Sequence, residues 1–249
     1  MLRLAEKENA EDHIPTGIEG LDALLYGGIP AGNQVVVSGG PGCGKTLMCF
    51  EIIYHMAKRG IPCAFIAFEE QENVVVNNFK KAFPSFSDVD ALMEKNLLVV
   101  DGADVSSKMH SSTESEAYSF GSVISSIEEV VRANNAKCIV IDSLSLVKLV
   151  FSKPNLYRRY MLALALSLKK LGVTSLLTLE LEHTNRKEAS FGPEAFVFDG
   201  TLVMYQDLEE DKRIFSIEVV KMRGSNHSLS FAPYEITNKG FRVFTISEA

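Results

Sequence analysis

The sequence predicts an α/β fold in which helices flank a mainly parallel sheet that continues into antiparallel strands near the C-terminal end. The first observation is an alternation, from residue 33 to residue 179, of short apolar runs with longer stretches of helical period. The second is a change to consecutive strand-like runs after residue 179. The third is a glycine-rich loop, GGPGCGKT at residues 39–46, between the first strand-like run and the first long helical stretch.

The elements follow in order from these patterns. A strand at 35–38 and a helix at 46–59 flank the glycine-rich loop, and Gly60 ends the helix after two basic residues in its last turn. The next runs predict a strand at 63–68, a helix at 72–83, a strand at 97–100, a helix at 123–133, a strand at 138–141, a helix at 156–171 and a strand at 173–179. Runs at 201–205, 213–221 and 229–236 are expected to be successive antiparallel strands or hairpins.

The ends of the chain and one internal segment do not fit these patterns. Residues 1–13 are expected to be a flexible tail, and residues 14–249 a single domain. Residues 106–119 are rich in serine and threonine and are expected to form a loop. The cysteines are scattered without a CxxC pair, which predicts small buried side chains at Cys43, Cys49, Cys63 and Cys138.

Composition and charge exclude several classes of protein. The chain has 249 residues, of which 46% are hydrophobic, so wholesale disorder is excluded. A formal net charge of −7 disfavours a protein that coats a polyanion, although a local basic groove is compatible with it. No apolar run approaches the roughly 18 residues of a membrane span. The charged start MLRLAEKENAED resembles no signal peptide, so we expect a cytoplasmic protein without a membrane contact.

The glycine-rich loop carries the strongest chemical signal. It matches G-x-x-x-x-G-K-[ST], a string that average composition would yield by chance in about one chain in a hundred. Glycines let main-chain N–H groups face phosphates, and the N-terminus of the following helix adds positive potential. We expect Lys45 to reach the β- and γ-phosphates of a nucleotide and the Thr46 hydroxyl to contact Mg²⁺. The predicted nucleotide-binding residues of this segment are Gly40, Pro41, Gly42, Cys43, Gly44, Lys45, Thr46 and Leu47.

Three carboxylates follow expected strands and complete the candidate site. Asp142 ends the apolar run 138–141, where it would hold Mg²⁺ through water, although it could instead cap the next helix. Glu69 and Glu70 follow the strand at 63–68, and adjacent strand residues point to opposite faces, so only one is expected to face the nucleotide directly. We expect Glu69 to be the base that activates water, but spacing alone does not select it over Glu70.

The motifs together resemble a single domain of the KaiC family, within the RecA-like P-loop ATPases. Besides the glycine-rich loop, they are FEE at 68–70, IDS at 141–143, KMRGSNH at 221–227, and the leader strings TGIEGLD at 16–22 and GGIPAG at 27–32. The resemblance runs from about residue 14 to residue 244. It implies a RecA-like fold and hexameric rings with Mg²⁺ and ATP at subunit interfaces. It also implies slow ATP hydrolysis, coupled to the assembly state or to a protein partner that the sequence does not name.

The resemblance also assigns residues to the shared site. Glu69, with Glu70 beside it, takes the place of the family's water-activating acid. Lys221 and Arg223 take the place of residues that reach the neighbour's γ-phosphate, and their spacing lets them project to one side of a strand. A solvated basic strand end is the alternative reading of that pair. Met222, Ser225 and His227 are implied to lie near the same nucleotide, Thr237 and Asn238 near its base and ribose, and Glu180 where the nucleotide state is sensed.

One departure from the family pattern bears on activity, and two other functions remain open beside the ATPase. Ala195 and Phe196 stand where phosphorylating members have hydroxyl acceptors, so autophosphorylation is not expected. A nucleotide-gated scaffold with little turnover is one alternative. A RecA/RadA-type DNA recombinase is the other, but residues 181–195 hold two basic against three acidic side chains, which disfavours a nucleic-acid partner.

Overall fold

The central sheet is predominantly parallel, as the alternating pattern predicts. The computed structural model describes residues 13–102, 116–150, 154–181, 191–209 and 212–245. Its large sheet has the strand order β11-β10-β9-β8-β3-β7-β6-β4-β5. The parallel strands are β8 (Gly200–Glu209), β3 (Gln34–Gly39), β7 (Thr174–Glu180), β6 (Cys138–Asp142), β4 (Cys63–Ala67) and β5 (Leu98–Gly102). The sheet continues antiparallel through β9 (Lys212–Met222), β10 (Ala232–Thr237) and β11 (Gly240–Val243).

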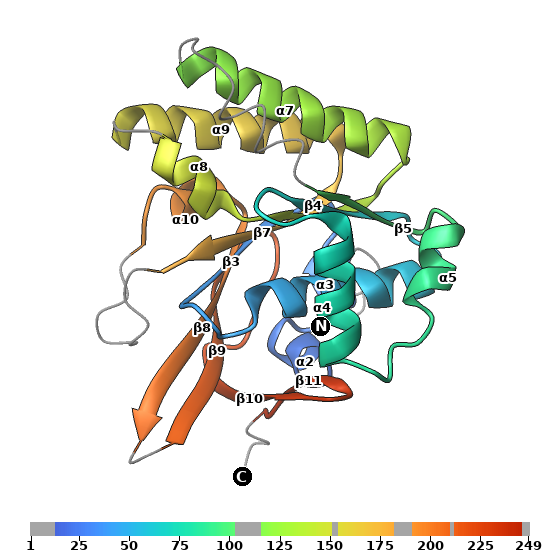
Figure 1. Cartoon of the computed structure of the whole chain (residues 1–249). Helices are drawn as coiled ribbons and strands as arrows, with labels where there is room; N and C mark the ends of the chain where they lie inside the picture. The colour runs from blue at the N-terminus through green and yellow to red at the C-terminus, as the bar shows by residue number, and fades with distance from the viewer. Residues whose placement is uncertain (1–12, 103–115, 151–153, 182–190, 210–211, 246–249) are drawn as a thin grey trace, which may run out of the picture.

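Helices cover both faces of this sheet and enclose a hydrophobic core on each (Figure 1). One face packs against α3 (Lys45–Lys58), α4 (Glu72–Ala82) and α5 (Val89–Glu94). The other packs against α7 (Glu116–Ala133), α8 (Leu144–Val150) and α9 (Pro154–Leu171). The strands β1 (His13–Ile14) and β2 (Ile29–Pro30) form a short antiparallel ladder, and α2 (Leu21–Leu24) lies between them in the chain. The helix α10 (Glu194–Val197) precedes β8. This three-layer architecture confirms the predicted fold class.

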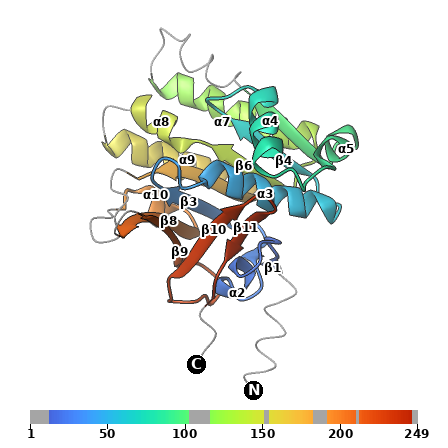
Figure 2. The same cartoon turned by 60° about the horizontal axis from the view of Figure 1, so that its bottom comes forward.

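The hairpin of β10 and β11 lies along α3, on the side of that helix away from the sheet centre (Figure 2). The α3 residue Glu51 is buried, and its carboxylate accepts the main-chain N–H of Phe241 in β11 at 2.9 Å. A buried carboxylate needs such partners, so this bond ties the hairpin to the helix that begins at the glycine-rich loop. None of the helices in the described ranges combines the length and apolarity that a bilayer crossing requires.

Some boundaries differ from the predictions. The run 229–236 becomes a strand only at Ala232, because Leu229 is 87% exposed and lies outside the ladder. Residues 116–119, expected in a loop, begin α7, since Glu and Ala are good helix formers. His13 of the expected tail lies in β1. Residues 1–12 of that tail, 106–115 of the serine-rich segment and 182–190 of the candidate DNA-binding loop are outside the described residues.

Candidate nucleotide-binding site

The glycine-rich loop connects the C-terminal end of β3 to α3. Gly42 and Gly44 have φ angles of 78° and 93°, a left-handed conformation that favours glycine. A Cβ on Gly39 would lie 2.7 Å from the carbonyl oxygen of Met204, so this position has no room for a side chain. Gly44 is the N-cap of α3 and has no side chain to cap it, so the first N–H groups of the helix are available to an anion.

Lys45 lies over this loop. Its ammonium nitrogen donates to the main-chain carbonyls of Gly39 and Gly40, both at 2.9 Å. A phosphate oxygen is a charged acceptor and would bind the ammonium more strongly than these neutral carbonyls do. The side chain is therefore held beside the place that the sequence predicts for the phosphates.

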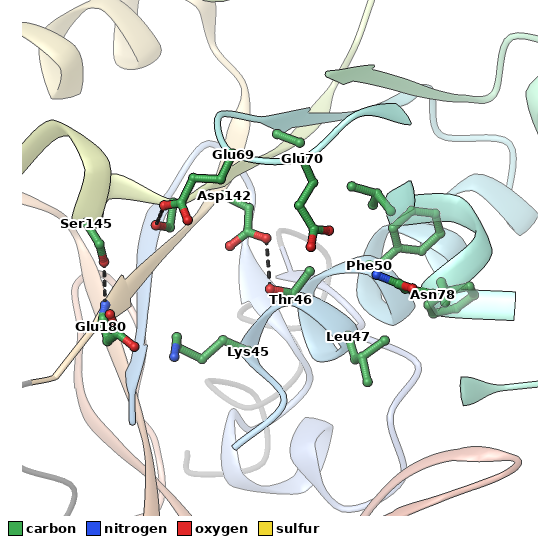
Figure 3. A pocket seen from close by; sticks show the side chains of 14 residues that line it. Lys45, Thr46, Leu47, Phe50, Glu69, Glu70, Asn78, Asp142, Ser145 and Glu180 are labelled. Carbon is green, nitrogen blue, oxygen red and sulfur yellow. Dashed lines mark hydrogen bonds between the residues drawn. The ribbon is translucent and has the colours of Figure 1, made fainter. Parts of the chain in front are cut away.

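Asp142 and Thr46 meet at the start of α3 (Figure 3). The Thr46 hydroxyl donates to Asp142 Oδ2 at 2.8 Å, and the Thr178 hydroxyl of β7 donates to Oδ1. A hydroxyl and a carboxylate in contact beside a phosphate loop suit Mg²⁺, which in nucleotide sites is bound by one or two side chains, phosphates and waters. Within the described ranges no three His, Cys, Asp or Glu side chains form a metal cluster, so the residues do not make an all-protein metal cage.

Glu69 and Glu70 both line the same cavity, although strand alternation predicted that only one would face it. The reason is that β4 ends at Ala67, so the two glutamates lie in a bend where alternation no longer applies. Ser143 donates to Glu69 Oε1 at 2.9 Å, and this carboxylate lies on the side of Ser145 and Glu180 (Figure 3). The Glu70 carboxylate instead points toward Thr46 (Figure 3).

The cavity has a volume of about 410 Å³ and is lined by both polar and apolar side chains. This is a usual size for a small-molecule site. Besides the residues above, it is lined by Leu47 and Phe50 of α3, by Val75, Asn78 and Phe79 of α4, and by Ser145 and Glu180. Sequence reasoning assigned no role to Ser145 or Asn78, because no motif marks them; only the fold brings them to the cavity. It also assigned none to Thr178, which is buried and acts on the site through its hydrogen bond to Asp142. The Glu180 side chain is exposed at the end of β7, and its main-chain N–H donates to Ser145 Oγ at 2.8 Å.

The β10–β11 hairpin packs against the glycine-rich loop. The Tyr234 hydroxyl donates to the main-chain carbonyl of Cys43 at 2.7 Å, and both side chains are buried. Burial raises the pKa of the Cys43 thiol, so the sulfur packs as a neutral side chain. Thr237 and Asn238 lie at the turn of this hairpin, where the Thr237 hydroxyl donates to the carbonyl of Gly240.

The basic pair and the glycine-rich loop lie at opposite ends of the central strands β3 and β8. The loop end of β3 pairs with β8 at Gly39 and Met204, whereas Lys221 pairs with Thr201 near the start of β8. Lys221 donates to the carbonyls of Ala195 and Phe198, both at 2.5 Å, and Arg223 to those of Phe196 and Val197 at 2.8 and 3.3 Å.

The other residues of the same string follow the basic pair at that end. Met222 is buried beside Gly200. Ser225 Oγ lies 2.9 Å from His13 Nε2, and His227 Nδ1 lies 2.9 Å from the carbonyl of Ser228. Within one chain the structure thus brings Lys45, Thr46, Glu69, Glu70 and Asp142 together, and it separates Lys221, Met222, Arg223, Ser225 and His227 from them.

Comparison with known proteins gives matches over nearly the whole chain. The sequence model of the family described as "ATPase: KaiC" matches residues 14–248. A "Circadian clock oscillator protein KaiC" of Picosynechococcus sp. is 33% identical over 235 residues, which cover 94% of this chain and 44% of that protein. A "UPF0273 protein" of Aeropyrum pernix is 33% identical over 239 residues, which cover 94% of each chain. This chain therefore spans less than half of the KaiC protein and nearly all of the archaeal one.

Proposed function

The chain belongs to the KaiC family of RecA-like ATPases, and on that premise we propose that it binds ATP with Mg²⁺ and hydrolyses it slowly at interfaces between copies of itself. The observation that carries the proposal is the division of the candidate site. The phosphate loop, Thr46, Asp142 and two glutamates share one cavity, whereas Lys221 and Arg223 lie at the other end of the same sheet.

Binding uses the loop, the helix N-terminus and Lys45. The loop N–H groups and the Lys45 ammonium hold the phosphates, and the first turn of α3 adds favourable potential. Thr46 and Asp142 would hold Mg²⁺, with the ion neutralising charge on the β- and γ-phosphate oxygens when it is bound. The hydrogen bond between their side chains supports this assignment, because it already brings hydroxyl and carboxylate together at 2.8 Å.

Hydrolysis requires a base and a group that stabilises the charge of the transition state. Glu69, held by Ser143, takes the proton of the water whose oxygen attacks the γ-phosphorus, and the bond from that phosphorus to the ADP oxygen breaks. Lys221 and Arg223 of a neighbouring copy supply positive charge to the γ-phosphate, an effect worth about 10³–10⁵ in rate in other nucleotide hydrolases. They cannot serve their own chain, because the full length of β3 separates them from its loop.

Light scattering and turnover with Mg·ATP test this proposal. We expect wild type to assemble in Mg·ATP and to release phosphate, and the Lys221→Ala/Arg223→Ala variant to lose turnover while each subunit still binds ATP. A monomer under all conditions would contradict the shared site. If wild type and Glu69→Gln both bind ATP and neither hydrolyses it, the chain is a nucleotide-gated scaffold and the enzymatic part of the proposal is wrong.

A further inference from the structure

Both side chains of the basic pair donate hydrogen bonds to main-chain carbonyls. Four consecutive carbonyls, of residues 195–198, accept hydrogen bonds from the Lys221 ammonium and the Arg223 guanidinium. Carbonyls at the C-terminal end of a helix have no partner within it and carry the negative end of its dipole. The short helix α10 and the residue after it thus form one binding site for both cations of the pair.

Asp199 directly follows these carbonyls and fixes them to the sheet. Its carboxylate is 5% exposed, and Oδ2 accepts the main-chain N–H of Gln34 in β3 at 3.3 Å. Its own main-chain N–H donates to the Gln34 carbonyl, and its carbonyl accepts the N–H of Arg223, both at 2.9 Å. Asp199 therefore joins the start of β3 to the backbone of Arg223.

The same carboxylate faces two cationic side chains, Arg223 of the basic pair and Lys169 of α9. Asp199 Oδ1 lies 3.5 Å from Arg223 Nη1 and 3.2 Å from Lys169 Nζ, and these two cationic side chains are 53% and 61% exposed. The anion is buried and fixed, whereas both cations reach into solvent. Burial lowers the pKa of Lys221, the neighbouring Arg223 lowers it further, and Asp199 opposes both effects.

From these contacts we propose that Asp199 is a positioning residue for the trans-acting pair. Its carboxylate holds the Arg223 guanidinium beside the α10 carbonyls, at the place from which it enters the site of a neighbouring copy. The inference rests on the proposed function, because that function gives the pair its role. Asp199 itself touches neither nucleotide nor metal in this scheme; it acts through Arg223.

The test is a double-mutant cycle on turnover. In the otherwise wild-type chain, we expect Asp199→Asn to lower kcat about tenfold to a hundredfold, the loss expected for a misplaced catalytic group, with KM changed less than about twofold. In the Arg223→Ala background, which keeps Lys221 and is compared on its residual turnover, the same substitution should have no further effect. Asp90→Asn is the matched control, since Asp90 pairs with Lys80 on the surface, and it should leave kcat unchanged. An equal loss in both backgrounds would overturn the proposal.

Two further measurements keep the inference separate from folding and from the proposed function. If Asp199→Asn does not fold, Asp199→Glu retains the charge and displaces the carboxylate by one methylene group, and it should still lower kcat at an unchanged KM. A crystal structure of the substituted chain tests the geometry without turnover. We expect the guanidinium to leave the carbonyls of Phe196 and Val197. An undisplaced Arg223 would overturn the inference, whereas a wild type without ATPase activity would contradict only the proposed function.

Discussion

Removing the hydroxyl of Tyr234 tests whether the β10–β11 hairpin holds the phosphate loop in its binding conformation. This hydroxyl donates at 2.7 Å to the carbonyl of Cys43, in the middle of the loop. Ile236 and Phe241 of the same hairpin lie so close to Gly44 that a Cβ there would approach them to 2.7 and 2.8 Å. We expect Tyr234→Phe to loosen the loop, because the ring still fills its place but the carbonyl loses its donor.

The magnitude follows from the burial of this hydrogen bond. Tyr234 is 2% exposed, so the Cys43 carbonyl has little access to water once the hydroxyl is gone. Leaving a buried acceptor unpaired costs about 1–3 kcal/mol, which corresponds to a fall in Tm of about 2–12 °C for a chain of this size. If about 1 kcal/mol of that cost falls on the binding conformation of the loop, the Kd for ATP rises about fivefold.

A fluorescent ATP analogue and thermal unfolding measure the two effects on the same samples. Tyr54→Phe is the control, because Tyr54 lies in the second half of α3, away from the loop, and its hydroxyl donates to Asp88 at the start of α5. We expect the control to leave the Kd for the analogue unchanged. If Tyr234→Phe lowers Tm and also leaves the Kd unchanged, the hairpin stabilises the fold without organising the loop, and the reasoning fails.

Three further outcomes follow from the site. Lys45→Ala should abolish binding of Mg·ATP in isothermal titration while circular dichroism shows an intact fold, and wild-type affinity would disprove the assignment of the loop. Glu69→Gln should keep ATP binding and lose most phosphate release, whereas a larger loss in Glu70→Gln would make Glu70 the base. Because burial lowers the pKa of Lys221 below 10.5, its charge is lost early as pH rises. Turnover should therefore fall on the alkaline side below that pH, and a pH–rate profile of Lys221→Ala should lack this limb.

The sequence predicts the helices that are long enough for an apolar period to repeat and that end at a clear stop residue. The helix α3 is recognisable because its apolar residues recur over fourteen positions between the loop and Gly60. The helices α5, α8 and α10 span 6, 7 and 4 residues, too few for a helical period to stand out. The parallel pairing of β8 with β3 is also not predictable from the runs alone, because a strand's composition does not identify its neighbour.

The candidate site also has parts that the sequence locates and parts that it does not. The glycine-rich loop, Asp142 and the glutamate pair are contiguous motifs, so spacing alone locates them. The contacts of Thr178 with Asp142 and of Tyr234 with Cys43 join residues 36 and 191 positions apart, and no local pattern marks them. The α10 carbonyls bind Lys221 and Arg223 through the backbone, which carries no sequence signal at all.

The length of β3 explains why one copy is not sufficient for the proposed reaction. The strand runs from Gln34, whose N–H is bound by Asp199, to Gly39, where the phosphate loop begins. Its five steps of about 3.3 Å separate the two ends by about 17 Å, farther than a lysine or arginine side chain extends. The strand is buried and paired on both sides, so it cannot bend to bring the ends together. In the proposed reaction, a γ-phosphate that binds both Lys45 and Arg223 is therefore expected to take them from two different copies.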